Sequence, residues 1–363
     1  MILHMNNEKC LLVSNMYPGA GHTFYGVFVK NIVDRLEILD LKFDKVVITG
    51  RGRTLLSKLL KYSLFYCKIF FLALFNKYKL VYVHYLNYSS LPLQLVIRLK
   101  EIRLVFNLHG SDLLPKTRLG KLLLAVNRNL LIKASLIIVP SSFYKKLLLK
   151  DYYIDENKIF VSPSGGVDCE LFRPVRVKRD SSIICIGYVS RIDQGKGWEI
   201  LLNAVERLYT QGDKNFRLIV AGSGKESAKF QNMLKGLTCQ QNIEYLGSIQ
   251  QDKLVDIYNQ MDVFIFPSYR KAESLGLVGL EAMACGIPVI GSNMGGLTEY
   301  ICEGINGYYF EPMNVNSLYC VIKRFMLLNK EEHYLLSYNA RKTALHFDRK
   351  IVIDKLYNRI YNL

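Results

Sequence analysis

Two glutamates that lie eight positions apart, Glu273 and Glu281, flank a glycine-containing turn that begins a short helical pattern. One carboxylate could hold the hydroxyls of a sugar, and the other those of a ribose. Free backbone N–H groups at the start of a helix favour a phosphate between them. The pattern indicates an enzyme that handles a nucleotide sugar. The alternative is a pair of surface glutamates, but Glu281 has largely apolar neighbours, and a buried acid needs a partner.

Two cations lie around an earlier turn. Arg191 and Lys196 flank a turn that contains Gly195 and ends at Gly197, after a strand pattern and before a helical one. Arginine offers a planar fork of donors and lysine a mobile point charge, so the two could converge on a diphosphate. The same arrangement is also typical of an ordinary helix start with solvated charges.

Apolar segments rich in β-branched residues alternate with helical patterns through both halves of the sequence. This alternation predicts an α/β fold with two Rossmann-like, doubly wound parallel-sheet domains. Ligands of such sheets lie beyond the carboxyl ends of the strands, so two facing domains would place a cleft between them. The predicted strands are 9–14, 45–49, 80–84, 104–109, 136–140, 159–162, 182–186, 216–221, 243–246, 263–267, 288–291 and 307–310.

A polar, aperiodic segment at 175–181 predicts the linker between the domains. We therefore expect an N-terminal domain over 1–177 and a C-terminal domain over 178–345. The helical pattern at 349–361 is amphipathic, and we expect residues 346–363 to pack back on the N-terminal domain.

The net charge of +17 is concentrated in the first half of the chain. Residues 1–177 hold 26 Lys and Arg against 12 Asp and Glu, a net of 26 − 12 = +14, and the remainder carries only +3. The stretch 51–98 has no acidic residue and intersperses its cations with Leu, Phe and Tyr, as a helix on an anionic membrane does. The alternative is a solvated basic face. Because no nucleic-acid-binding signature is present, we expect no nucleic acid partner.

The remaining sequence-wide features exclude other classes. The eight cysteines have no CxxC pair or regular spacing, which indicates reduced core cysteines in a cytoplasmic protein. No long apolar run is present, so we expect neither a membrane span nor a signal peptide.

These motifs together resemble family 4 of the retaining glycosyltransferases, the glycosyl transferases group 1, which have the GT-B fold. The resemblance is carried by the Glu273–Glu281 pair and by GYVSRIDQGKG, GGVDCELFRP and GGLTEYICEGINGYYF in and around the second half. The more divergent first half contributes SNMYPGAGHTFYGVFVKN and NLHGSD. The resemblance implies that the N-terminal domain binds the acceptor and the C-terminal domain binds the nucleotide sugar.

The resemblance also implies roles for single residues. Arg191 and Lys196 would neutralise the donor diphosphate, Glu281 would bind the ribose, and Glu273 would contact the donor sugar. Backbone N–H groups would assist from Ser274, Leu275, Gly276 and Leu277. His109 would lie against the sugar near the reacting carbon, although it could also be a strand-end histidine bonded to its own loop. Gly19 and Gly21 would let the backbone approach the phosphates.

The implied reaction is transfer of a sugar, with retention of anomeric configuration, from a UDP- or GDP-sugar to a glycan or lipid-linked glycan. Bacterial surface polysaccharide or lipopolysaccharide assembly is the expected setting, on the inner face of the plasma membrane. We expect no cofactor and no metal, because the two cations could neutralise the diphosphate. The alternatives are an epimerase or a glucan phosphorylase of the same fold, and a non-catalytic scaffold that binds a nucleotide sugar.

Overall fold

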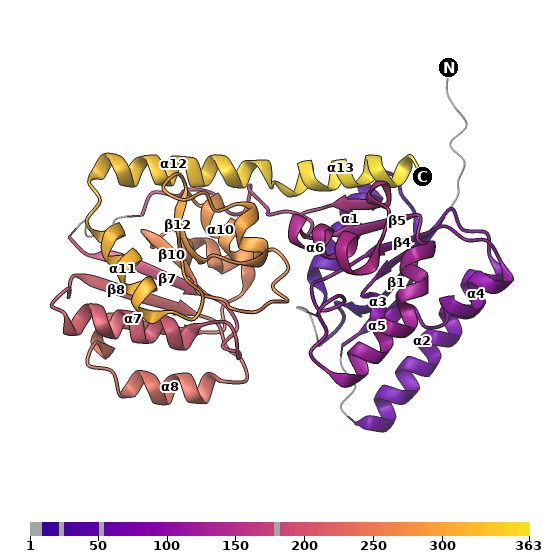
Figure 1. Cartoon of the computed structure of the whole chain (residues 1–363), viewed down its shortest axis with the longest axis horizontal. Coiled ribbons are helices and arrows are strands. Elements are labelled where there is room, and N and C mark those ends of the chain that lie inside the picture. The colour runs from indigo at the N-terminus through magenta and orange to yellow at the C-terminus, as the bar shows by residue number, and fades with distance from the viewer. Residues whose placement is uncertain (1–8, 22–24, 51–53, 178–181) are drawn as a thin grey trace, which may run out of the picture. The chain divides into compact units, whose positions relative to one another are not determined.

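The computed structural model describes residues 9–21, 25–50, 54–177 and 182–363 (Figure 1). Residues 178–181 of the predicted linker, and Arg51 and Arg53 of the basic stretch, therefore lie outside the described residues. The chain divides into two compact units. The N-terminal unit contains residues 1–165 and 350–363, and the C-terminal unit contains 166–349. The first crossing of the chain between units thus lies before the predicted linker. Within the C-terminal unit, the Val167 N–H donates to the Phe347 carbonyl and the Arg349 N–H donates to the Val167 carbonyl.

Six parallel strands form the sheet of the N-terminal unit, in the order β2-β1-β3-β4-β5-β6. Each predicted strand of this half is confirmed, with shifts of a few residues at the ends. The strands are β1 Cys10–Tyr17, β2 Phe43–Thr49, β3 Val81–His84, β4 Leu104–Asn107, β5 Leu136–Val139 and β6 Ile159–Val161.

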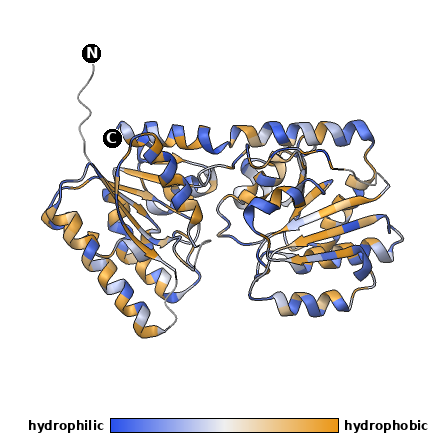
Figure 2. Cartoon of the chain, turned by 180° about the vertical axis from the view of Figure 1, so that it is seen from behind, coloured by the Kyte–Doolittle hydropathy of each residue, from blue (hydrophilic) through white to orange (hydrophobic). Residues whose placement is uncertain are grey.

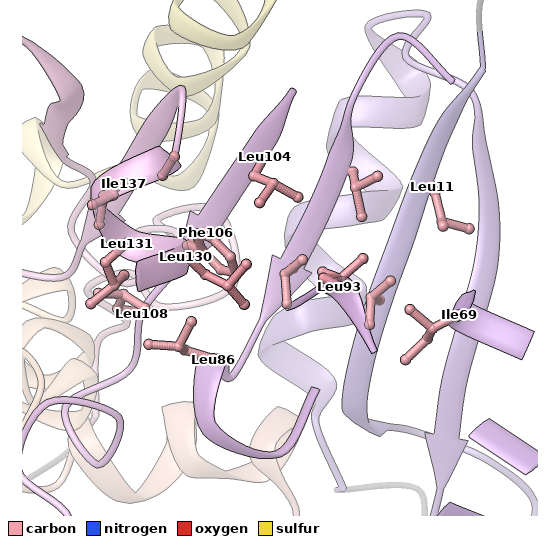
Figure 3. Packing of buried hydrophobic residues seen from close by; sticks show 14 of the residues in the cluster. Leu11, Ile69, Leu86, Leu93, Leu104, Phe106, Leu108, Leu130, Leu131 and Ile137 are labelled. Carbon is pink, nitrogen blue, oxygen red and sulfur yellow. The ribbon is translucent and has the colours of Figure 1, made fainter. Parts of the chain in front are cut away.

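Helices cover both faces of this sheet, as the alternating pattern predicts. They are α1 Val27–Ile38, α2 Leu55–Phe75, α3 Leu86–Ser89, α4 Leu93–Leu99, α5 Arg118–Lys133, α6 Ser142–Leu147 and α13 Arg349–Tyr361. Figure 3 shows the core on one face, where Ile69 of α2, Leu93 of α4 and Leu130 of α5 pack against strand residues such as Leu11. On the other face, α1 and α13 pack on the sheet in one cluster of buried residues, and an Arg35–Asp354 ion pair joins the two helices.

The C-terminal unit repeats this design, with six parallel strands in the order β12-β11-β10-β7-β8-β9. The six strands predicted for this half are also confirmed in existence and order. They are β7 Ile184–Val189, β8 Phe216–Ala221, β9 Ile243–Gly247, β10 Val263–Phe266, β11 Val289–Ser292 and β12 Gly307–Phe310. The prediction of two doubly wound parallel sheets is therefore confirmed.

The α-helices of the C-terminal unit are α7 Trp198–Thr210, α8 Ser227–Lys235, α9 Leu254–Tyr258, α10 Leu277–Ala284, α11 Val315–Met326 and α12 Lys330–His346. Short 3₁₀ turns include η4 Gln251–Lys253 and η5 Gly295–Glu299. Some boundaries follow from the local sequence. The α12 helix, for example, begins with a capping box in which Asn329 and Glu332 each accept a hydrogen bond from the other's backbone N–H.

None of the helices described in the structure combines the length and the apolar character that a membrane crossing requires.

Candidate active site

An ion pair lies at the carboxyl end of the sheet in the C-terminal unit. Lys196 Nζ, from the loop after β7, lies 2.7 Å from Glu273 Oε2, from the loop before α10. The Ser268 hydroxyl donates a 2.8 Å hydrogen bond to the same carboxylate oxygen. Because β7 and β10 are neighbours in the sheet, the loops that follow them meet at one edge. The structure therefore brings together two of the residues that the sequence singled out.

The charge on Glu273 is fixed by its surroundings. Burial raises the pKa of this carboxyl. The charge and hydrogen bond of Lys196, the Ser268 hydroxyl and the charge of Arg270 together lower the pKa by more than burial raises it. The net pKa lies below the ordinary value for a glutamate, so the group is ionised at neutral pH. The side chains of Lys196 and Glu273 are only 11% and 17% exposed, so water screens their attraction weakly.

Two glycines place the lysine. Gly195 and Gly197 both have left-handed backbone angles, with φ of 86° and 75°, which residues with a side chain adopt at a cost. A Cβ atom on Gly197 would lie 1.9 Å from the Pro267 carbonyl oxygen. The Lys196 loop thus packs directly on the backbone that leads to Ser268.

Arg191 lies on the same loop but in a more open position. Its guanidinium pairs with Asp193 at 2.9 Å, and its side chain remains 64% exposed. A side chain that is largely in water can change partner at low cost. The Arg191 guanidinium is therefore free to exchange Asp193 for another anion.

The backbone from Ser274 to Leu277 leads into α10. Gly276 caps the helix at φ 83°, and a Cβ there would lie 2.4 Å from Phe266 Cε1. The η5 turn holds the other side, because a Cβ on Gly296 would lie 2.6 Å from Leu275 Cα. The first turn of a helix has N–H groups without intrahelical acceptors, so this packed segment presents donors in a fixed direction.

Glu281 lies one turn into α10 and is 6% exposed. Its Oε2 accepts a 2.9 Å hydrogen bond from the Tyr258 hydroxyl, and its Oε1 accepts a 3.3 Å bond from the Gln251 amide. Burial raises the pKa of this carboxyl, and the two hydrogen bonds offset part of the rise. The partner that a buried acid at this position requires is therefore Tyr258.

In the N-terminal unit, His109 follows β4 and stacks on His84, the last residue of β3. His84 Nδ1 and His109 Nε2 share a 3.1 Å hydrogen bond, and the ring centroids are 5.3 Å apart. Tyr85, at a left-handed φ of 62°, places its ring 4.5 Å from that of His109. Burial lowers the pKa of His109 to about 3, so its imidazole is neutral at physiological pH.

Asp112 closes the loop that carries His109. Its Oδ2 accepts a 2.7 Å hydrogen bond from the His109 backbone N–H, and the side-chain amide of Asn87 donates to its carbonyl. Burial raises the pKa of Asp112 to about 7, although hydrogen bonds from His109 and Asn87 lower it in part. The local-bonding alternative for this histidine thus holds for its backbone, while its ring pairs with β3.

The two glycines of the loop after β1 differ in what they require. A Cβ on Gly19 would lie 2.7 Å from Thr49 Cβ, at the end of β2. Gly21 has open space where a Cβ would point, but its φ of 78° favours glycine. Both positions therefore have a structural reason for glycine that is independent of any phosphate.

Four further residues complete these arrangements and were missed by the sequence reasoning. Ser268 and His84 stand at or just beyond strand ends, and that position in a parallel sheet is the signal that could have found them. Tyr258 and Gln251 lie in α9 and η4, and no local pattern connects them with Glu281. The four are Ser268, His84, Tyr258 and Gln251.

Two protein-family models match adjacent parts of this chain. Residues 23–171 match the model described as Glycosyltransferase Family 4, and residues 172–343 match Glycosyl transferases group 1. The chain therefore belongs to this family of glycosyltransferases, as the motifs indicate.

Individual relatives and solved structures agree with this assignment. The sulfoquinovosyl transferase SQD2 of Arabidopsis thaliana is 29% identical over 243 residues, which are 63% of this chain and 45% of that protein. The chain thus spans less than half the length of this curated relative. The sucrose-phosphate synthase structure from Thermosynechococcus elongatus has a TM-score of 0.78 at 20% identity, covering 98% of this chain and 99% of that one. Anabaena HepE, solved in complex with UDP, has a TM-score of 0.73 at 19% identity, covering 98% and 100%. The fold is that of the GT-B glycosyltransferases.

Proposed function

We propose that this protein is a retaining, metal-independent glycosyltransferase that transfers a sugar from a UDP- or GDP-sugar to a glycan or lipid-linked acceptor. The observation that carries the proposal is the Lys196–Glu273 pair beside the N-terminus of α10. It combines a cation, an ionised carboxylate and directed N–H groups in one place. A nucleotide sugar needs these three kinds of group, for its diphosphate and for its hydroxyls.

The reaction breaks the bond between the anomeric carbon and the diphosphate oxygen, and the electron pair leaves with the diphosphate. The acceptor oxygen forms the new bond on the same face, and its proton passes to the departing diphosphate. Lys196, Arg191 and the N–H groups from Ser274 to Leu277 would stabilise the growing negative charge. Because Lys196 and Arg191 can supply positive charge, we propose that no metal ion is required.

The other site residues take roles that fit their surroundings. Glu273, which is ionised, would accept hydrogen bonds from the donor sugar, and Glu281 would do so from the ribose after partly releasing Gln251. His109 would contact the sugar as a neutral imidazole rather than as a cation, because its pKa lies far below physiological pH. Gly19 and Gly21 would lie near the phosphates. The HepE complex with UDP supports a uridine donor, since that neighbour shares the fold.

A membrane-presented acceptor is supported by the outer face of α2. Five large apolar side chains and Cys67 form a continuous stripe on the side of this helix away from the sheet. Figure 2 shows the hydrophobic colour on much of the ribbon of this helix. The lysines Lys61 and Lys68 follow one edge of the stripe. We therefore propose peripheral attachment to the anionic inner face of the plasma membrane, in surface polysaccharide or lipopolysaccharide assembly. The α2 stripe consists of Leu56, Leu60, Leu64, Cys67, Phe71 and Phe75.

The test is turnover of a panel of UDP- and GDP-sugars with a glycolipid extract as acceptor, in the presence of EDTA, followed by NMR of the product anomer. The proposal predicts product with the anomeric configuration of the donor and an unchanged rate with EDTA. Product of inverted configuration, or a rate abolished by chelation, would contradict it. Conversion of donor without acceptor would instead indicate an epimerase.

A further inference from the structure

A basic pocket lies in the N-terminal unit at the sheet edge opposite to His109. The cavity has a volume of about 730 Å³ and is lined by residues around the starts of β3 and β4 and the end of α5. Four cations and one carboxylate line it: Lys79, Lys100, Arg103, Lys133 and Glu101. The net positive charge of these five side chains favours binding of an anion. Nothing in the proposed transfer reaction uses this edge, where the strands begin.

Two of the four cations are committed to the protein. The Lys100 ammonium donates to the carbonyls of Ala73, Leu74 and Asn76 at the end of α2, which uses all three of its protons. Lys79 Nζ donates to the Tyr361 carbonyl and lies 4.6 Å from the centre of that ring. These two lysines therefore hold backbone segments around the pocket in place.

The other two cations remain available. In the ranges that the structure describes, neither the Arg103 guanidinium nor the Lys133 ammonium has a hydrogen bond or an ion pair, and both residues are exposed. A planar fork beside a point charge matches the oxygens of a phosphate group. The pocket thus offers two unpaired donors to an anion.

Apolar side chains next to the pocket distinguish a lipid from a dissolved anion. Leu99 directly precedes Lys100 and is 66% exposed. Phe75, which is 73% exposed, lies between Leu74 and Asn76, whose carbonyls both accept from Lys100. Phe75 is also the last residue of the α2 stripe. Since α2 and α4 pack together, the apolar ends of both helices flank the same cationic cavity.

We propose that this basic pocket binds the phosphate headgroup of an anionic membrane lipid, with Arg103 and Lys133 as its ligands, while Phe75 and Leu99 enter the acyl boundary. This inference deepens the proposed membrane attachment and rests on it. Apolar side chains of an interfacial helix enter the headgroup and acyl boundary by about 5–10 Å. Cations next to such side chains therefore lie at the depth of the headgroup phosphates. The pocket thereby orients α2 on the bilayer.

The experiment compares the double variant Arg103→Gln/Lys133→Gln with Lys146→Gln/Lys150→Gln, which removes the same charge from exposed lysines elsewhere in the N-terminal unit. Both full-length variants and the wild type are titrated with phosphatidylcholine vesicles, with and without phosphatidylglycerol. The pocket variant should lose about 25-fold in affinity for the anionic vesicles, about fivefold for each charge. The control variant should lose much less. Because all four side chains are exposed, the variants should fold, and circular dichroism checks this.

Three results would overturn parts of the account separately. Equal losses in the two variants would show that the charge of the unit acts diffusely and that the pocket is not a headgroup site. Binding of soluble glycerol phosphate or inorganic phosphate as tight as binding of anionic vesicles would assign the pocket to a free anion. If the wild type ignores anionic vesicles altogether, the proposed membrane attachment itself is wrong, while activity on a water-soluble acceptor would leave the transferase proposal intact.

Discussion

The two units differ in the charge state of the side chains at the carboxyl edges of their sheets. In the C-terminal unit, the groups beyond the strands are charged, because Lys196 and Glu273 neutralise each other at 2.7 Å. In the N-terminal unit, no charged partner for His109 or Asp112 is found among the described residues. Burial there holds His109 neutral and raises the pKa of Asp112 to about 7. Burial penalises charge in both places, so the presence of a counter-charge decides which edge keeps ionised side chains at neutral pH.

The strongest test of this contrast is the replacement of Lys196 by a neutral residue. Lys196→Ala should lower turnover by about 10²–10³-fold, the cost of losing one donor to a developing negative charge in other enzymes. The measurement is steady-state turnover at saturating donor. Lys229→Ala, on an exposed helix position, is the matched control and should keep the wild-type rate.

The variant Lys196→Ala also leaves Glu273 without its partner, and the chain could unfold for that reason alone. The double variant Lys196→Met/Glu273→Gln replaces the pair by neutral side chains of similar size and separates the two effects. It should fold and remain inactive. A folded double variant with the wild-type rate would remove the pair from the mechanism.

The role of Glu281 can be measured with a donor that lacks the ribose 2′-hydroxyl. The wild type should prefer the ribose donor to the 2′-deoxy donor by about 10- to 100-fold in kcat/KM, the range expected for a hydrogen bond to a charged group. Glu281→Gln should lose most of this preference, while Glu244→Gln, an exposed residue paired with Arg217, should retain it. If Glu281→Gln discriminates as well as the wild type, Glu281 only holds Tyr258.

The raised pKa of Asp112, in the loop after β4, should make the stability of the protein depend on pH. The pKa of Asp112 is about 7 in the folded state and 3.8 by reference, so between these values the folded protein binds a proton that the unfolded chain has released. Wild-type stability is therefore lost as the pH rises through this window, by at most about 1.4 kcal/mol per pH unit from this group. Asp112→Asn does not titrate.

The free energy of unfolding of Asp112→Asn, minus that of the wild type, should thus increase from pH 4 to pH 7. Urea unfolding at several pH values measures this difference. The depressed pKa of His109 acts in the opposite direction, since the unfolded chain binds its proton first as the pH falls below 6.5. That contribution is common to both proteins and cancels in the difference. Parallel stability curves would show that Asp112 is ionised when folded.

The smallest expected effect concerns the α2 stripe. Lys61→Gln and Lys68→Gln should each weaken binding to anionic vesicles by about fivefold and leave binding to neutral vesicles unchanged. Lys214→Gln and Lys229→Gln, in the C-terminal unit, serve as controls of equal charge. The measurement is vesicle co-sedimentation at two salt concentrations, since added salt should reduce the difference. A loss that is equal in all four variants would refute a specific role for α2.

The sequence was sufficient for the fold. Central strands such as 136–139 are β-branched, apolar runs that are buried on both faces of a sheet, and the predicted strands differ from the observed ones only at their ends. The sequence also singled out Lys196 and Glu273, which the structure places 2.7 Å apart, because glycines and a helix start mark their loops. The chain passes from the N-terminal to the C-terminal unit near residue 165 and not at 175–181. The reason is that the Arg349 N–H bonds to the Val167 carbonyl, and no local sequence pattern indicates such a contact between distant segments.

The partners of the site residues were beyond sequence reasoning for the same reason. His84 meets His109 because β3 and β4 are neighbours, and Tyr258 meets Glu281 because α9 packs on α10. Each of these contacts is set by sheet order and packing. The available charge in the basic pocket likewise depends on which lysines the fold has already used, and composition alone does not distinguish Lys100 from Lys133.

The most direct test of the charged edge is calorimetric titration of UDP, GDP and ADP into the wild type and Lys196→Met. The account predicts that one nucleoside diphosphate binds the wild type and that the variant binds it at least about tenfold more weakly, since a charge-assisted bond is lost. Equal affinity of the two proteins for that nucleotide would contradict the assignment of Lys196 to the diphosphate.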